Sequence, residues 1–479
     1  MNTQSVQFKK DLLRSLKIYI ENNELKSFLT SDKYNFVGPF SKALANVIAE
    51  SKNFYIFRKD LYEKKMKKKY SFETIEEKEI AEIFLKQYNL NSYLETSNKY
   101  KYFFKLLSYK VIILLITLLK KLLTHKKLES PQNIAFYLIN TSDILRAKKI
   151  RYKNLKNIYF DKFYFFKKIF NLSFNKNFFF IDTFKSNKYL YIYKTWVSFF
   201  LIQQSIINIR PKLIISFEGD HYDHENIYLV AKSLKIKALC IQSATDLEKF
   251  QKVGFHNINQ SKLLVWSKYY KNIYKKISPN LQTKVVGNYF IKKKKNSKKY
   301  IGIILQLKAN DVSHKKFEEF KLLINWLCLN YKKKIIIRRH PYDINDDYDL
   351  KNLIDLKNII IHDPNKILIG ETLNLCSFII TKHSSAIIEA ASIGVIPIIF
   401  APMKLEKSIE ALGSYDTPLI HTSINKMKTT INKLYDDEKK ANKIKKDLIS
   451  NFKNYINYSG NESLRRVNAE IAKLINTKV

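Results

Sequence analysis

Short apolar runs separated by longer amphipathic stretches dominate the chain from about residue 131 onwards. One series lies at 134–140, 178–182, 213–217, 238–242 and 263–266, and a second at 301–305, 334–339, 358–362, 377–381 and 395–400. Strands that are apolar on both faces and alternate with helices are typical of parallel sheets covered on both sides. The pattern therefore predicts an α/β protein with two Rossmann-like, doubly wound parallel-sheet domains.

Amphipathic stretches between the apolar runs predict the helices. They lie at 189–209, 222–234, 313–331, 366–374, 386–393, 423–436 and 438–456. The part before the first run is mostly helical in pattern; its clearest helix lies within 71–88, where Thr74 and Glu77 have the spacing of a capping box. A run of lysines from 292 to 299 has the composition of a solvated linker between the two sheets.

These features divide the chain into four segments. The domains that we expect are a mostly helical region (1–128), a first Rossmann-like domain (129–290), a second Rossmann-like domain (291–450) and a C-terminal helix (451–479). Ligands of open parallel sheets bind beyond the carboxyl ends of the strands. The chemistry is therefore expected in a cleft between the two sheets, just after the apolar runs.

The net positive charge of the chain favours a negatively charged partner but does not identify which kind. The 479 residues include 85 Lys and Arg against 43 Asp and Glu, a net charge of +42. Such a charge attracts nucleic acid, anionic lipid or phosphorylated ligands. Most aromatic residues lie inside apolar runs, which disfavours an exposed base-stacking groove and hence a nucleic-acid partner.

The cysteines and the first residues of the chain indicate the cellular compartment. Cys240, Cys328 and Cys376 each lie in an apolar run without paired spacing, as expected of reduced core thiols in the cytosol. The first 24 residues contain no apolar stretch long enough for a signal peptide. These patterns favour a cytoplasmic protein.

One segment, residues 102–123, could contact lipid. Its apolar core of about nine residues is flanked by lysines and falls short of the ~20 residues needed to span a bilayer. Two interpretations stay open: a buried helix of the N-terminal region, or a helix lying in the plane of an anionic membrane. The second would make the protein peripheral at the inner face of the cytoplasmic membrane.

The first candidate site lies between residues 381 and 397. Ser384 and Ser385 follow an apolar run and can cap a short helix that ends at Gly394. Serine hydroxyls and free backbone N–H groups at a helix start can bind a phosphate. Glu389, one turn further, is placed to face a ribose hydroxyl. The alternative is a structural serine cap with a solvent-facing glutamate.

A second candidate site follows the run at 334–339. Arg338, Arg339, His340 and Pro341 stand together at the carboxyl end of a predicted strand. Arginine and protonated histidine suit phosphate oxygens, and such a histidine can stabilise a leaving phosphate. The alternative is a surface arginine pair. Because both candidate sites follow strands of one predicted sheet, we expect them to converge on one crevice.

The first Rossmann-like domain supplies the candidate base. The run at 213–217 is followed by Glu218, Gly219 and Asp220. A carboxylate at the end of a strand, next to a glycine that allows a tight turn, can deprotonate an acceptor hydroxyl. Glu218 is the first choice and Asp220 the second, although either could cap the next helix. A metal site at 220–225 lacks a second group of ligands, so no metal is predicted.

These motifs resemble those of a known group of enzymes. Arg338–Pro341, followed by His383, Ser384, Ser385 and Glu389, resembles the HP and SS motifs of GT-B glycosyltransferases of bacterial capsule and lipopolysaccharide synthesis, including sialyl-, polysialyl- and Kdo-transferases. The resemblance implies that His340, Ser384 and Ser385 bind the nucleotide phosphate. It also implies a GT-B fold without metal or other cofactor, in which residues 129–290 form the acceptor domain and residues 291–450 the nucleotide-donor domain. Unlike the two acids that precede a glycine in that group, only Glu218 precedes Gly219 here.

The sequence therefore predicts a glycosyltransferase that moves a sugar from a nucleotide-activated donor to a surface-polysaccharide acceptor, either a glycan or a lipid-linked glycan. A CMP-sugar is favoured over a UDP-sugar on the resemblance. A CDP-glycerol glycerophosphotransferase would use the same phosphate site. A sugar-nucleotide epimerase shares the two-domain plan, and a non-enzymatic nucleic-acid binder rests on the net charge alone.

Overall fold

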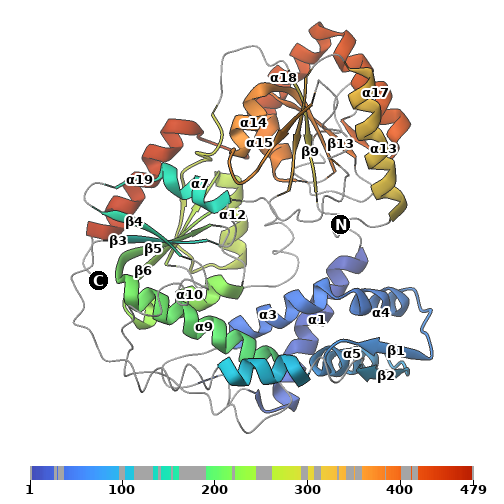
Figure 1. Cartoon of the computed structure of the whole chain (residues 1–479), viewed down its shortest axis with the longest axis vertical. Coiled ribbons are helices and arrows are strands. Elements are labelled where there is room, and N and C mark those ends of the chain that lie inside the picture. The colour runs from blue at the N-terminus through green and yellow to red at the C-terminus, as the bar shows by residue number, and fades with distance from the viewer. Residues whose placement is uncertain are drawn as a thin grey trace.

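The computed structural model shows a helical N-terminal lobe followed by two α/β units, with the last helix returning to the first unit (Figure 1). The residues it describes are 3–25, 30, 37–96, 103–112, 133–138, 142–152, 155–160, 190–217, 222–243, 261–292, 300–306, 314–331, 334–340, 350, 359–382, 384–400, 412 and 419–476.

The N-terminal lobe is mostly helical, as predicted. It contains α1 (Thr3–Asn22), α3 (Val37–Glu50), α4 (Lys52–Tyr62) and α5 (Ile75–Gln87), with a parallel strand pair of β1 (Lys69–Phe72) and β2 (Tyr93–Thr96). The capping box is confirmed, because the Thr74 hydroxyl accepts from the Glu77 N–H and the Glu77 carboxylate accepts from the Thr74 N–H. The strand at residues 69–72 was not predicted.

The first α/β unit is built on a six-stranded parallel sheet. Its strands are β3 (Asn133–Tyr137), β4 (Lys156–Phe160), β5 (Pro211–Phe217), β6 (Lys237–Ile241), β7 (Lys262–Val265) and β8 (Thr283–Val285), in the order β4-β3-β5-β6-β7-β8. The sequence pattern missed β4 and β8, because edge strands keep lysine and other polar residues on their open side. The predicted strand at 178–182 lies outside the described residues.

Helices cover both faces of this sheet. They are α7 (Ser142–Lys149), α9 (Leu190–Ile209), α10 (Tyr222–Ser233) and α12 (Lys268–Ile277). Alternate residues of β3 point to opposite faces: Ile134 and Phe136 pack in one apolar cluster with residues of α7, whereas Ala135 and Tyr137 pack in the other. Helices α9 and α10 also contact α3, which joins the N-terminal lobe to this unit.

The second α/β unit has a sheet of the same kind. Its strands are β9 (Tyr300–Ile304), β10 (Ile335–Arg338), β11 (Ile359–His362), β12 (Cys376–Thr381), β13 (Ile396–Phe400) and β14 (Ile420–His421), in the order β11-β10-β9-β12-β13-β14. All neighbouring strands are parallel. When the six strands are numbered by their order in the sequence, their order across the sheet is 3-2-1-4-5-6, which is the Rossmann order. Its helices are α13 (His314–Asn330), α14 (Ile369–Leu375), α15 (Ala386–Ser392), α17 (Ile424–Asp436) and α18 (Glu438–Phe452).

Two segments of the chain connect the α/β units, and these segments run side by side. Asn288, on the way out of the first unit, donates its backbone N–H to the Tyr458 carbonyl and accepts from the Gly460 N–H, on the way back from the second. Gly287 has φ +86°, and a Cβ there would lie 2.1 Å from the Tyr458 carbonyl oxygen. Only glycine combines this backbone conformation with so close an approach.

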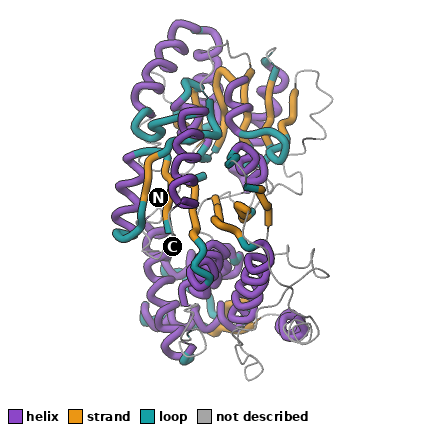
Figure 2. The backbone as a smooth tube through the Cα atoms, turned by 90° about the vertical axis from the view of Figure 1, so that its left-hand side faces the viewer, coloured by secondary structure: helices purple, strands orange, loops and turns teal. Residues whose placement is uncertain are grey.

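The last helix, α19 (Gly460–Asn476), packs on the first unit (Figure 1), where Glu470 pairs with Lys262. Figure 2 shows the strands of the units, in orange, with helices, in purple, around them. Each sheet with its helices thus forms a layered unit, and the chain crosses between the units twice. None of the helices in the described ranges has the length and apolar composition to cross a bilayer. All three cysteines are buried.

Candidate active site at the edge of the second sheet

The two predicted phosphate motifs lie at the same edge of the second sheet. His340 follows β10 and Ser384 follows β12, and these parallel strands flank β9. Two inter-strand spacings separate the axes of β10 and β12, about 10 Å. The strand order reverses between β9 and β12, where Rossmann-type sheets bind their ligands. His340 and Ser384 therefore lie on either side of a natural ligand-binding position.

The serine pair begins a very short helix. The Ser384 hydroxyl accepts from the Ala386 N–H at 3.2 Å, whereas the Ser385 hydroxyl makes no capping bond, and both residues are half-buried. Gly394, with φ +72°, ends the turn after α15, as predicted. Because α15 has seven residues, its dipole contributes little. Any anion binding here depends on the hydroxyls and on neighbouring cations.

Arg338 is buried, and its guanidinium group has partners inside the protein. Its Nη1 donates to the Ile367 carbonyl at 2.7 Å and to the Thr372 hydroxyl at 3.2 Å. The same hydroxyl lies 3.0 Å from Nδ1 of His362. Burial lowers the pKa of Arg338 to about 10, so its guanidinium remains charged at neutral pH. Arg338 holds α14 against the sheet, behind the candidate site.

Arg339 and His340 directly follow β10, at the carboxyl edge of the second sheet. The Arg339 N–H donates to the His362 carbonyl at 3.4 Å, which extends the pairing of β10 with β11 by one residue. His340 is therefore the first residue beyond the sheet. Both side chains are half-buried, an environment that lets a cation approach a ligand while part of its hydration is removed.

Glu389 lies in the seam between the two α/β units. It is 3% exposed, and its Oε1 accepts from Nδ2 of Asn288 at 2.9 Å. Burial raises the pKa of Glu389, an effect opposed by the Asn288 hydrogen bond and by the charges of Arg146 and Arg338. This carboxylate has a partner across the seam and so helps to join the units. Its contact with a ribose hydroxyl stays a prediction.

Arg146, on α7 of the first unit, completes this seam. Its Nη1 lies 3.0 Å from the Asp143 carboxylate, and its guanidinium carbon lies 4.9 Å from the centre of the Phe290 ring. Its charge influences both Glu389 and Arg338 of the second unit. The seam thus combines two guanidinium groups with two carboxylates, a balanced arrangement for buried charges.

Sequence reasoning missed Arg146, because nothing in its local pattern marks it. The spacing of Asp143 and Arg146 indicates only a pair on one helical turn. Asn288 had a weak sequence signal for a position between the units, because it follows Gly287 where the chain leaves the first unit.

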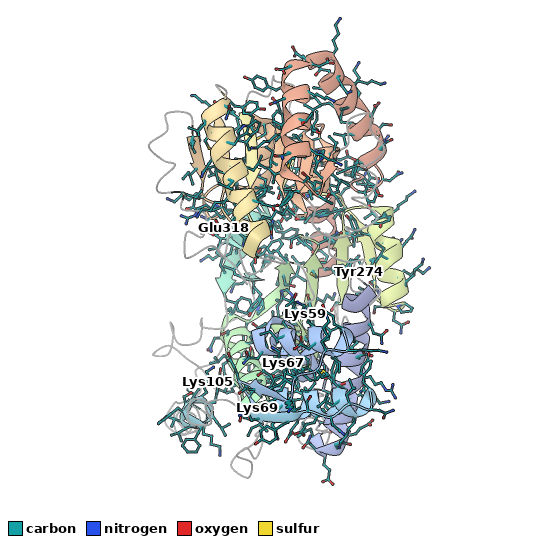
Figure 3. All side chains as sticks on the ribbon, turned by 90° about the vertical axis from the view of Figure 1, so that its right-hand side faces the viewer. Lys59, Lys67, Lys69, Lys105, Tyr274 and Glu318 are labelled. Carbon is teal, nitrogen blue, oxygen red and sulfur yellow. The ribbon has the colours of Figure 1, made fainter. Side chains whose placement is uncertain are left out.

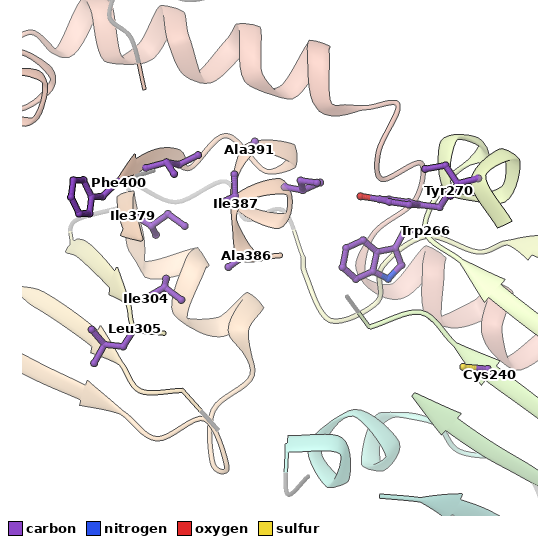
Figure 4. Close-up of a cluster of buried hydrophobic side chains, with 14 of the residues drawn as sticks. Cys240, Trp266, Tyr270, Ile304, Leu305, Ile379, Ala386, Ile387, Ala391 and Phe400 are labelled. Carbon is purple, nitrogen blue, oxygen red and sulfur yellow. The ribbon is translucent and has the colours of Figure 1, made fainter. Parts of the chain in front are cut away.

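Figure 4 shows buried apolar side chains from both units. Ala386 and Ile387 belong to α15 of the second unit, and Trp266 follows β7 of the first unit.

Several predicted site residues lie outside the described residues: Glu218, Asp220, Pro341 and His383. Of residues 220–225, which were considered for a metal site, the structure describes those on α10, from residue 222 onwards. Asp223 is buried and accepts hydrogen bonds from the hydroxyls of Tyr137 and Ser198, at 3.1 and 2.6 Å. Within the described ranges, no group of three or more metal-ligating side chains gathers.

No known family model and no curated protein matches the chain. Among solved structures, it resembles a UDP-GlcNAc 2-epimerase from Neisseria meningitidis bound to UDP-GlcNAc, with 14% identity and a TM-score of 0.45, covering 71% of this chain and 99% of that one. A Methanocaldococcus jannaschii UDP-GlcNAc 2-epimerase in complex with UDP-GlcNAc and UDP shares 18% identity, with a TM-score of 0.42 and coverage of 71% and 99%.

A third similar structure is the sucrose-phosphate synthase from Thermosynechococcus elongatus, with 10% identity, a TM-score of 0.39 and coverage of 71% and 98%. The fold assignment rests on the strand order of this chain itself. Two Rossmann-like parallel sheets, joined by two crossings of the chain, define the GT-B fold. The protein is thus an α/β chain of GT-B type that carries a helical N-terminal lobe.

Proposed function

We propose that this protein is a glycosyltransferase that uses a nucleotide-activated sugar, with the donor phosphate bound at the edge of the second sheet. The observation that carries the proposal is the position of His340 and Ser384 on either side of β9, where the strand order reverses. Arg339 and His340 supply positive charge there, and the hydroxyls of Ser384 and Ser385 supply hydrogen bonds.

The reaction needs an acceptor hydroxyl and a leaving nucleotide. A carboxylate, Glu218 or alternatively Asp220 as predicted from the sequence, takes the proton of the acceptor hydroxyl. The acceptor oxygen then forms a bond to the anomeric carbon of the donor sugar. The bond from that carbon to the donor phosphate oxygen breaks, and its electron pair leaves with the nucleotide. Arg339 and His340 stabilise the negative charge that develops on the phosphate.

The finer assignments come from the motif resemblance. A CMP-sugar is the favoured donor, and the acceptor is a bacterial surface glycan or its lipid-linked precursor at the inner face of the cytoplasmic membrane. CDP-glycerol remains the alternative donor, because glycerophosphate transfer would use the same phosphate-binding residues.

A nucleotide-binding assay tests the proposal. We expect one of CMP, CDP, UDP and GDP to raise the melting temperature of the full chain, because a ligand that binds the folded state stabilises it. His340→Ala should remove that shift and abolish transfer without changing the melting temperature of the free protein. Arg465→Ala, at an exposed position on α19, is the control and should behave like the wild type.

The outcomes separate the candidate functions. A response to CMP with sugar transfer supports the proposal, whereas a response to CDP with glycerophosphate transfer supports the alternative. Consumption of a UDP-sugar without any acceptor would identify an epimerase. Full turnover by the His340→Ala variant would overturn the assigned role, and DNA binding without a nucleotide response would refute an enzyme of this type.

A further inference from the structure

An exposed apolar stripe runs along a helix over residues 103–112, beside the N-terminal lobe. Phe103, Phe104, Leu107 and Val111 are 54%, 65%, 43% and 46% exposed. At 100° per residue, these four positions fall within a 100° arc of the helix. Single exposed apolar residues are common on protein surfaces, but four on one helical face are not.

One side of this helix is covered. Leu106 lies about 60° around the helix from Phe103 and is buried, and burial raises the pKa of Tyr109, about 60° further round. Ser108 and Lys105, beyond Phe104 on the other side of the stripe, are exposed. The most apolar face of the helix is therefore open, whereas a neighbouring face is covered.

The charges near the stripe are positive. Lys110 lies at its border, about 20° around the helix from Phe103, and Lys105 is exposed about 100° beyond Phe104 (Figure 3). The turn between α4 and β1 adds a dense group of lysines at the same end of the molecule's long axis, as Figures 1 and 3 show. These are Lys64, Lys65, Lys67, Lys68 and Lys69, the last of which begins β1. Part of this charge is balanced within the lobe, because Lys65 lies 3.8 Å from Glu63, Lys67 3.9 Å from Asp60 and Lys69 2.9 Å from Glu95.

We infer that the apolar stripe inserts into the interface of an anionic membrane, with the helix lying in the membrane plane. Phenylalanine rings partition into the boundary between headgroups and acyl chains, and lysines beside them contact anionic headgroups. The stem of Lys110, at the border of the stripe, can extend along the apolar surface while its ammonium group reaches phosphate oxygens. A protein partner with an apolar groove would not require the surrounding positive charge, whereas an anionic bilayer matches both features.

Vesicle binding tests the inference with the full chain and without donor or acceptor, so its outcome is independent of the proposed reaction. We expect sedimentation with vesicles that contain phosphatidylglycerol and at least ~10-fold weaker binding to phosphatidylcholine alone. Replacing Phe103 and Phe104 together by serine should weaken binding to the anionic vesicles at least ~10-fold, because both rings leave the interface. Leu322→Ser with Leu329→Ser, two exposed leucines on α13, is the matched control and should bind like the wild type.

A second variant reports on insertion directly. Phe104→Trp should show a blue shift of tryptophan emission, relative to the wild-type protein, when anionic vesicles are added. Lipids brominated on the acyl chains should quench that added emission. The inference is overturned if the serine variant binds as well as the wild type, or if the introduced indole shows neither shift nor quenching. A change from dimer to monomer in the serine variant, with vesicle binding unchanged, would identify a subunit interface instead.

Discussion

The hydrogen bond between Asn288 and Glu389 offers a direct test of how the two α/β units are held together. Asn288 is fully buried and Glu389 is 3% exposed, and their bond joins residues 101 positions apart. Asn288→Ala removes this bond and also the bond that the Asn288 Oδ1 accepts from the Phe290 N–H at 2.8 Å. The carboxylate then stays buried with only the charges of Arg146 and Arg338 to compensate it.

The cost can be worked from these contacts. Losing a hydrogen bond to a buried charged group costs about 1.5–3 kcal/mol, and losing the second, neutral bond costs about 1 kcal/mol. The two together come to about 2.5–4 kcal/mol, a large share of the ~5–15 kcal/mol that stabilises a typical domain. Glu389→Gln keeps the shape but removes the charge, so it should cost less than Asn288→Ala.

Urea unfolding at neutral pH measures these differences. We expect Asn288→Ala to lower the free energy of unfolding by about 3 kcal/mol, and the double variant with Glu389→Gln to cost less than the sum of the two single changes, because the residues are in contact. If Asn288→Ala changes stability by less than about 0.5 kcal/mol, or if the two effects simply add, the bond does not hold the units together.

The pH dependence follows from the raised pKa of Glu389. In the folded state, this carboxyl binds its proton more tightly than in the unfolded chain. Its contribution to stability is therefore fully present below the ordinary carboxyl pKa and is lost as pH rises through the raised folded-state value. The stability of the wild type relative to Glu389→Gln should fall over that window; a difference that is constant with pH would contradict the assignment.

Three further changes test other parts of the structure. Gly370→Ala should lower stability by about 1–3 kcal/mol in urea unfolding, because its Cβ would lie 2.1 Å from the Phe290 carbonyl oxygen; an unchanged midpoint would show that α14 is not packed this closely. Cys328 should resist a thiol reagent at pH 8 until the protein unfolds, since burial raises its pKa to about 11, and rapid modification of the folded protein would refute that burial. Ser384→Ala with Ser385→Ala should weaken nucleotide binding about 10-fold in calorimetry through the lost hydroxyl donors, whereas unaltered affinity would remove the serine pair from the site.

The sequence by itself determined most of the regular structure, because these elements follow from local patterns. Apolar runs that are buried on both faces identified strands such as β5 and β12, and the amphipathic stretch after residue 189 identified α9. Capping chemistry set two boundaries, at Thr74 and at Gly394. The sequence also predicted two parallel sheets, with residues of the types that bind phosphate after strands of the second sheet.

Only the tertiary structure decided which of those residues meet and what each contacts. The strand order sets His340 and Ser384 on either side of β9, and no local pattern encodes which strand lies between them. The sequence predicted Arg338 and Glu389 as ligand contacts, and the structure adds that they bond to Thr372 and Asn288 inside the protein. The physical reason is that burial and partner geometry depend on contacts between distant segments, whereas sequence periodicity reports only which face of an element is apolar.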